Sequence, residues 1–160
     1  MSSSAEELVD RSAVSDVVYA YATALDTRDW DLFAQCLADP IYIDYSTFDP
    51  SLDLQMPRGD WVERVRLGLS GFDVTQHISS NHRHKIAGDR AQCVSYMQAS
   101  HFLKNGEGFE TCTLFGYYTN DLERSGADWR IAKCALTITA HDGDMGVFAR
   151  AAERFAASGG

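Results

Sequence analysis

The sequence predicts an α+β fold in which helices pack on one face of a curved sheet. Up to Gly71 the apolar side chains recur mainly at helical spacing, and from residue 72 onward the period changes to two. Three hairpin signals then divide the second half, at 87–90, 105–108 and 125–128. Helices followed by an antiparallel meander are the order typical of this class.

The first helix is expected at about 6–25. Apolar side chains, among them Val14, Val18 and Tyr21, line one of its faces. Asp26 follows directly, where free carbonyls and the negative end of the helix dipole disfavour a carboxylate by about 0.3–1 kcal/mol. We therefore expect a cation or a hydrogen-bond donor beside Asp26, and our hypothesis is that a histidine supplies it.

The other elements outside the meander follow from local signals. Thr27 or Asp29 can cap a second helix, and the prolines and aspartates of 49–57 are typical of a loop. The expected positions are a helix at 29–38, a strand at 41–45, a helix at 61–69 and a final helix at about 144–157.

Length and composition indicate one domain over residues 1–160, with residues 1–5 and 157–160 frayed. The hydrophobic fraction of 45% argues against disorder. The net charge of -9, from 23 acidic against 14 basic residues, disfavours nucleic acid as a partner. No segment has the pattern of a signal peptide or approaches the ~20 apolar residues of a membrane span, so we expect a cytoplasmic protein without membrane contact.

Cysteine and histidine spacing gives no metal motif. The cysteines stand far apart in apolar stretches, without CxxC spacing, and are expected to be buried reduced thiols. They are Cys36, Cys93, Cys112 and Cys134. His82 and His84 are expected on the strand surface, no HExxH is present, and 141–144 is too short for an EF-hand. We expect no metal.

Strand parity places one histidine inside the fold. In the segment 91–101 the odd positions are mainly small or apolar and end in His101, which is therefore expected to face the helices. The preceding segment, 74–79, contains His77 and has no clean apolar alternation. A polar strand inside an apolar meander indicates a cavity that is lined by some of its side chains.

Asp26 and His77 are the first candidates for chemistry. Buried titratable groups need partners, and imidazole titrates near neutral pH. A carboxylate bonded to the far ring nitrogen fixes the tautomer and stabilises the imidazolium that forms when the ring takes a proton. The pair is therefore a candidate general base.

Five stretches of the chain resemble scytalone dehydratase and the wider SnoaL-like, nuclear-transport-factor-2-like (NTF2-like) superfamily. In chain order they are 19–31, 43–48, 75–77, His101 and 128–132. The resemblance implies a cone-shaped fold whose curved, mixed, mostly antiparallel sheet carries N-terminal helices on its concave face. It also implies an enclosed pocket for a small-molecule substrate, no cofactor, and a homodimer or homotrimer.

The resemblance also implies roles for four residues. Asp26 matches the acid that orients the catalytic histidine, and His77 matches a histidine that moves protons in the elimination. His101 matches a second active-site histidine, and Tyr45 matches a tyrosine that helps to hold water against the substrate carbonyl. The positions of Asp26 and His77 also match the dyad of hexachlorocyclohexane dehydrochlorinase.

Three positions depart from scytalone dehydratase. Leu25 stands where that enzyme has a second tyrosine, and Gly116 and Tyr118 stand, in an ungapped alignment, where it has a serine and an asparagine. The residues that match proton transfer in scytalone dehydratase are therefore present, whereas the residues that match its substrate recognition differ.

The sequence thus predicts a cofactor-independent lyase, a dehydratase acting on a small cyclic or aromatic-like hydroxy-ketone. His77, polarised by Asp26, would remove a proton alpha to a carbonyl, and Tyr45 would steady the enolate. His77 or His101 would then protonate the departing hydroxyl. The expected substrate-binding residues are Tyr21, Leu25, Trp61, Met97, Phe115 and Tyr118.

Other interpretations stay open at this level. A polyketide cyclase or ketosteroid-isomerase-like isomerase would share the fold but lose no water, and a non-catalytic binding or assembly subunit would use the cone without chemistry. Asp26 alone can be a solvated carboxylate in a turn. His77 and His101 can be satisfied core histidines, and Tyr45 and Tyr118 can be packing residues.

Overall fold

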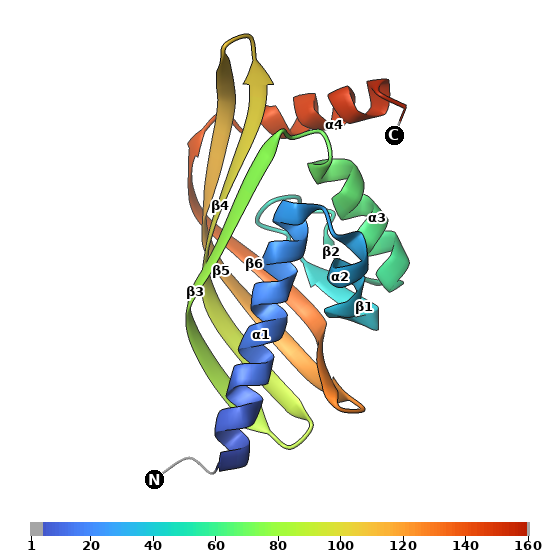
Figure 1. Cartoon of the computed structure of the whole chain (residues 1–160), viewed down its shortest axis with the longest axis vertical. Coiled ribbons are helices and arrows are strands. Elements are labelled where there is room, and N and C mark those ends of the chain that lie inside the picture. The colour runs from blue at the N-terminus through green and yellow to red at the C-terminus, as the bar shows by residue number, and fades with distance from the viewer. Residues whose placement is uncertain (1–4, 160) are drawn as a thin grey trace.

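The computed structural model describes residues 5–159, which form helices and one curved sheet (Figure 1). The helices are α1 Ala5–Thr27, α2 Trp30–Gln35, α3 Arg58–Leu69 and α4 Val147–Ala157. The strands are β1 Leu37–Asp44, β2 Asp53–Met56, β3 Val74–Ala87, β4 Arg90–Asn105, β5 Gly108–Ser125 and β6 Asp128–Gly143. The predicted α+β class is confirmed.

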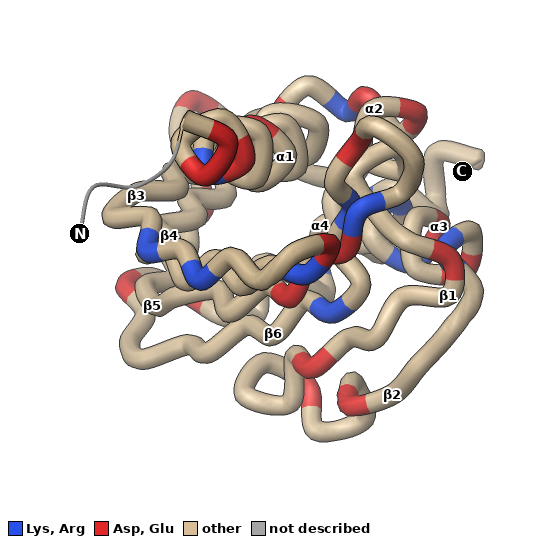
Figure 2. The backbone as a smooth tube through the Cα atoms, turned by 90° about the horizontal axis from the view of Figure 1, so that it is seen from below, with Lys and Arg blue, Asp and Glu red and all other residues tan. Residues whose placement is uncertain are grey.

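The strands form one sheet in the order β2-β1-β6-β5-β4-β3. Every neighbouring pair is antiparallel except β1 and β6, which run parallel. The sheet curves around α1, while α2 and α3 lie near β1 and α4 lies beside α3 (Figures 1 and 2). The mixed, mostly antiparallel sheet with helices on its concave face is therefore as expected.

An apolar stripe seats α1 in the concavity of the sheet. The buried residues of this helix are Val14, Val18, Tyr21, Ala24 and Leu25, at the spacing of one helical face. Burying a large apolar side chain contributes roughly 1.5–3 kcal/mol relative to leaving it exposed. This stripe fixes the C-terminal end of α1, and Asp26 with it, over the sheet.

The meander from β3 to β6 has its turns at the three predicted places. On β4 the odd-numbered residues from Ala91 to Leu103 are buried, and His101 is only 3% exposed. The parity prediction for His101 is confirmed, because side chains alternate faces along a strand.

A bulge in β3 changes which residues face inward. Before the bulge, His77 lies on the inner face. Between Ser80 and Arg83 the register with β4 shifts, so that β3 carries one extra residue. Beyond the bulge, His82 and His84 are half-buried and hydrogen-bonded to α1. The expectation that these two histidines lie on the strand surface is wrong, because the bulge brings even-numbered residues inward.

Two boundaries in the first half differ from the prediction. α2 ends at Gln35 rather than at residue 38, because β1 begins at Leu37, which pairs with Ile131 of β6. The loop expected at 49–57 contains β2, whose residues pair with β1. Both differences arise from strand pairing, of β1 with β6 and of β2 with β1, which local sequence signals do not report.

The helix ends are largely as predicted. The Asp29 side chain accepts a hydrogen bond from the Leu32 backbone N–H at 2.9 Å and caps α2. α3 and α4 confirm the expected third and final helices. Ala5 and Ala157 are helical rather than frayed, and the same expectation for residues 1–4 and 160 lies outside the described residues.

The four cysteines are buried and form no disulfide, as expected. No helix within residues 5–159 combines the length and apolar character needed to cross a bilayer.

On the outer face of the sheet, Ile78 and Tyr96 are 46% and 60% exposed. The expected homodimer or homotrimer stays a prediction, and this face is where we would look for the interface.

Candidate active site

A cavity of about 250 Å³ lies between the helices and the concave face of the sheet. An engineered cavity of about 150 Å³ holds benzene, so there is room here for a substituted ring. Five of the six expected substrate-binding residues line the cavity: Tyr21, Leu25, Trp61, Met97 and Tyr118. The sixth expectation is wrong. Phe115 lies on the outer face and is 36% exposed, because the even-numbered residues of β5, such as Leu114, face inward.

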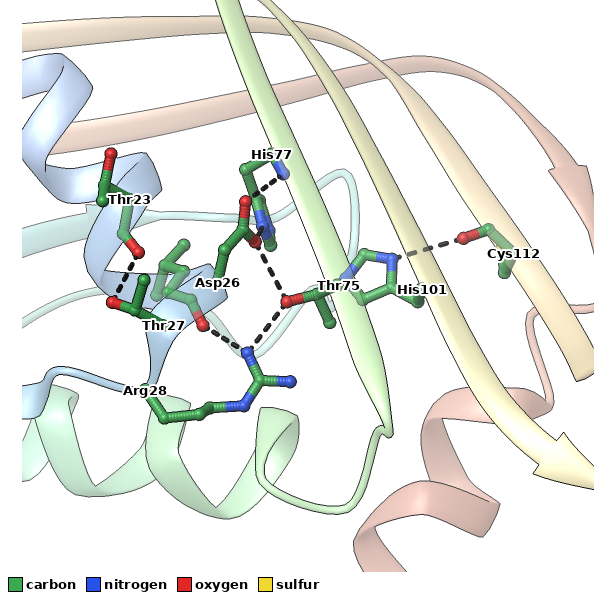
Figure 3. A network of polar contacts seen from close by, with 9 residues as sticks. Thr23, Asp26, Thr27, Arg28, Thr75, His77, His101 and Cys112 are labelled. Atoms are coloured by element: carbon green, nitrogen blue, oxygen red, sulfur yellow. Dashed lines mark hydrogen bonds and ion pairs between the residues drawn. The ribbon is translucent and has the colours of Figure 1, made fainter.

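Asp26 and His77 form a hydrogen-bonded dyad at the cavity wall (Figure 3). His77 Nδ1 lies 2.6 Å from Asp26 Oδ1, and the His77 backbone N–H donates to Asp26 Oδ2 at 2.7 Å. A carboxylate only accepts, so Nδ1 carries a proton, and in the neutral ring the lone pair is on Nε2. The His77 side chain is 8% exposed. The hypothesis that a histidine lies beside the carboxylate at the end of α1 is confirmed.

Thr75 and Arg28 support the carboxylate from another side (Figure 3). Thr75 Oγ1 donates to Asp26 Oδ1 at 3.0 Å, and Arg28 Nη1 donates to Thr75 Oγ1 at 2.8 Å and to the Leu25 carbonyl. Because Arg28 occupies a lone pair of the hydroxyl, the single Thr75 proton is left for Asp26. Arg28 also supplies positive charge at the C-terminal end of α1, whose last turn has no basic residue.

The net effect of this environment is an ionised Asp26. Burial raises the pKa of Asp26, but the hydrogen bonds and charge of His77, together with the Thr75 hydrogen bond, outweigh it and lower the pKa below its ordinary value. Asp26 therefore carries its negative charge at neutral pH. A charged carboxylate on Nδ1 stabilises the imidazolium that His77 forms when Nε2 takes a proton.

His101 lines the same cavity in apolar surroundings. Its ring centroid lies 5.5 Å from that of His77, 5.1 Å from Phe72 and 4.6 Å from Phe148. Its Nδ1–H donates to the Cys112 carbonyl at 3.3 Å. Burial, followed by the charge of His77, lowers the pKa of His101 to about 3. His101 is therefore neutral at neutral pH, and its ring has the Ala99 backbone as a further hydrogen-bond partner.

Three tyrosines meet at another wall of the cavity. The hydroxyls of Tyr21 and Tyr45 lie 2.6 Å apart, and the Tyr118 ring centroid is 5.9 Å from that of Tyr21 and 6.3 Å from that of Tyr45. Burial, with a smaller contribution from nearby Cys134, raises the pKa of all three phenols. Each hydroxyl therefore keeps its proton and can donate a hydrogen bond. Tyr21, expected only as a wall, belongs to this polar group.

Several residues of the site and of the cavity wall were not predicted from the sequence. Thr75 had a signal, because it precedes His77 by two residues on the same strand face. No sequence signal marks Arg28, because its role depends on a left-handed backbone with φ of 60° directly after α1. The missed apolar walls are Phe48, Leu52, Val65, Leu69, Leu114, Leu136 and Phe148.

The positions that depart from scytalone dehydratase separate into two kinds. Leu25 and Tyr118 line the cavity, so they can change its preference for substrate. Gly116 does not line it, and a Cβ at this position would lie 2.0 Å from the Thr137 carbonyl oxygen. Within residues 5–159, three potential metal-ligating side chains converge outside this cavity, at His82, His84 and Cys93.

A profile of the SnoaL-like domain matches residues 6–135. The chain belongs to the SnoaL-like domain family. This SnoaL-like protein is 28% identical over 150 residues to terrestric acid biosynthesis cluster protein E of Penicillium crustosum, covering 89% of this chain and 92% of that protein. A 45-residue segment is 40% identical to the scytalone dehydratase-like protein AacuK of Aspergillus aculeatus, covering 28% of this chain and 26% of that protein.

Solved structures share the NTF2-like fold of this SnoaL-like protein. Kfla4162 of Kribbella flavida superposes with a TM-score of 0.82 at 24% identity, covering 92% of this chain and 99% of that one. A candidate scytalone dehydratase of Novosphingobium aromaticivorans has a TM-score of 0.75 at 18% identity, covering 86% and 89%. Hexachlorocyclohexane dehydrochlorinase LinA type 2 has a TM-score of 0.72 at 17% identity, covering 88% and 92%. The fold and superfamily expected from the sequence are confirmed.

Proposed function

We propose that this SnoaL-like protein is a cofactor-independent dehydratase that acts on a small cyclic or aromatic-like hydroxy-ketone. The observation that carries the proposal is the His77 ring, held by Asp26 at 2.6 Å and lining a mainly apolar cavity. Removal of a proton alpha to a carbonyl needs a base of fixed tautomer and hydrogen-bond donors for the enolate oxygen. His77 is such a base, and the tyrosine group supplies such donors.

In the first step, His77 Nε2 takes the proton from the carbon next to the substrate carbonyl. The electron pair of the broken C–H bond forms the enolate, and negative charge develops on the carbonyl oxygen. Tyr45 or Tyr118 donates a hydrogen bond to this oxygen, directly or through a water. Asp26 balances the positive charge that appears on the His77 ring.

In the second step, the enolate re-forms the carbonyl and expels the hydroxyl from the next carbon. The hydroxyl takes the proton from His77 Nε2 and leaves as water, so the enzyme returns to its starting state. His101 is the less suitable donor, because its ring is neutral and its single proton is directed to the Cys112 carbonyl. His101 is better suited to accept a hydrogen bond from a substrate hydroxyl.

Using one histidine in both steps has a stereochemical consequence. The hydrogen and the hydroxyl that leave must lie on the same face of the substrate ring, the face that contacts His77. The comparisons support an elimination in general terms, since the names of two similar proteins describe the loss of water and of hydrogen chloride.

The experiment incubates the purified protein in D₂O with a panel of one- and two-ring β-hydroxy-ketones. We expect deuterium to enter the alpha position of a substrate and a product lighter by one water to accumulate, both detected by mass spectrometry. Asp26→Asn should lower both rates by about 10²–10⁴-fold, the range of general acid–base catalysis. Asp31→Asn, which changes an exposed carboxylate of α2, is the matched control and should leave both rates unchanged.

The outcomes separate the alternatives. Deuterium exchange without loss of water would contradict dehydration and favour an isomerase or cyclase. Ligand binding that is equal in the wild type and Asp26→Asn, with neither exchange nor water loss, would contradict catalysis and favour a binding or assembly subunit.

A further inference from the structure

Outside the cavity, side chains from α1, β3 and β4 form a compact cluster. The potential ligand atoms of His82, His84 and Cys93 all lie within 4.8 Å of one another. Ser15 of α1 adds a hydroxyl that lies 2.9 Å from His82 Nδ1 and 2.8 Å from His84 Nε2. None of these residues lines the substrate cavity. The cluster is therefore separate from the proposed chemistry.

The fold assembles this cluster in two ways. The β3 bulge turns His82 and His84 toward α1, two residues apart on one strand face. Across the ladder, His84 is paired directly with Cys93 of β4, whose side chain is fully buried. In Figure 2 the N-terminal half of α1 lies next to β3 and β4. Sequence spacing could not show this group, because Cys93 joins the histidines only through strand pairing.

Hydrogen bonds within the protein leave the cluster incompletely satisfied. Ser15 has one hydroxyl proton for two histidine nitrogens, so one ring must donate to it and the other must accept from it. If His84 Nε2–H donates, Ser15 can donate to His82 Nδ1, and His82 Nε2–H can donate to Ser79 Oγ at 2.9 Å. His84 Nδ1 then keeps a lone pair, and this atom is shielded from solvent without a partner among the described residues.

We propose that His82, His84 and Cys93 bind a zinc ion that fastens α1 to β3 and β4. Two imidazoles and a thiolate are ligands of the type that zinc prefers, and Ser15 of α1 would complete the set, directly or through a zinc-bound water. On binding, the Cys93 S–H bond breaks, the proton passes to solvent and a sulfur–zinc bond forms. The net charge of -9 favours the approach of a cation.

The required movement is small. Tetrahedral zinc with Zn–N of about 2.0–2.1 Å and Zn–S of about 2.3 Å places its ligand atoms about 3.4–3.6 Å apart. Because the three atoms lie within 4.8 Å of one another, side-chain rotations that bring them closer by at most about 1.4 Å suffice. Because Asp26 lies in the last turn of α1, the metal would also hold the helix that carries the catalytic carboxylate.

The test titrates the purified full-length protein with Co²⁺ as a spectroscopic probe and then with Zn²⁺ as competitor. We expect one Co²⁺ per chain, a thiolate-to-cobalt charge-transfer band in the near ultraviolet, and displacement by one equivalent of Zn²⁺. The dissociation constant for Zn²⁺ should be tighter than about 1 μM, as for structural zinc sites.

Variants locate the site. Cys93→Ser should abolish the charge-transfer band and weaken Zn²⁺ binding by about 100-fold or more, and His82→Asn should weaken it similarly. Cys36→Ser, the matched control at another buried cysteine, should bind as the wild type does. Circular dichroism confirms that each variant is folded.

Thermal unfolding supplies a readout independent of cobalt. Zn²⁺ should raise the Tm of the wild type and of Cys36→Ser but not that of Cys93→Ser. Either of two results would overturn the proposed zinc site. One is a wild-type protein that shows no charge-transfer band with Co²⁺. The other is Zn²⁺ binding that is unchanged in Cys93→Ser and His82→Asn. Neither result would bear on the dehydratase proposal, because the cluster does not line the cavity.

Discussion

His77 and His101 lie with their ring centroids 5.5 Å apart in one cavity, yet their surroundings differ in kind. His77 directs Nδ1 to a carboxylate, which is itself supported by Thr75 and Arg28. His101 directs Nδ1 to a backbone carbonyl and packs between Phe72 and Phe148. A carboxylate stabilises the protonated ring, whereas apolar contacts disfavour it.

Proximity to the cavity alone therefore does not assign a catalytic role. Only His77 has a partner whose charge balances a proton taken from substrate. His101 has an environment that keeps it neutral, which suits an acceptor of hydrogen bonds. Substitution of each histidine, and then of Thr75, which supports the partner of His77, tests this difference.

The largest effect is expected from removal of the base. His77→Ala should lower kcat by about 10⁴-fold, because neither Asp26 nor His101 can take its place at the substrate carbon. The measurement is the rate of water loss on the substrate identified from the panel. His141→Ala, at an exposed histidine, is the control and should keep full activity. A loss below 10-fold would contradict the role of His77.

A smaller effect is expected on stability in acid. The pKa of His101 is about 3 in the folded protein and about 6.5 in the unfolded chain, so between these values the unfolded chain binds the additional proton. Stability contributed by the neutral ring is therefore lost as pH falls from 7. His101→Gln cannot titrate and should lose about 2 kcal/mol less unfolding free energy than the wild type between pH 7 and pH 5.

Urea unfolding at both pH values measures this difference. Contributions from other groups, including the lowered pKa of Asp26, are common to both proteins and cancel. Equal losses in the wild type and His101→Gln would show that His101 is not held neutral by burial.

The smallest effect is expected at Thr75. Thr75→Val keeps the shape but removes the hydroxyl that donates to Asp26, and we expect kcat to fall by about 10-fold with KM little changed. Thr75→Ser restores the hydroxyl and should recover most of the rate. If the serine and valine variants lose equal activity, packing of the methyl group rather than the hydrogen bond explains the effect.

The fold and the core of the site were largely predictable because their signals are local or periodic. The stripe of α1 and the alternation on β4 gave the inward positions of Asp26 and His101. Phe115 lies outside because the same alternation on β5 places its neighbour Leu114 inside. The wrong expectation for Phe115 can therefore be corrected from the sequence alone.

Other features depend on geometry that no linear pattern contains. Arg28 reaches back to Thr75 only because the chain takes a left-handed conformation after α1. The bulge in β3 reversed the expected position of His82 and His84, and β2 formed because β1 offered it a partner. Each of these features depends on a backbone conformation or on strand pairing rather than on a periodic pattern of side chains.

In the proposed mechanism, Asp26 fixes the proton on Nδ1 of His77 and leaves Nε2 as the base. It is tested most directly by ¹⁵N NMR of the histidine rings at about pH 8, where an ordinary imidazole is neutral, with the His77 signals assigned by their absence in His77→Gln. We predict a protonated Nδ1 and an unprotonated Nε2 in the wild type, with loss of this preference in Asp26→Asn. A wild-type ring protonated at Nε2 would contradict the account, because that tautomer cannot take a proton from the substrate.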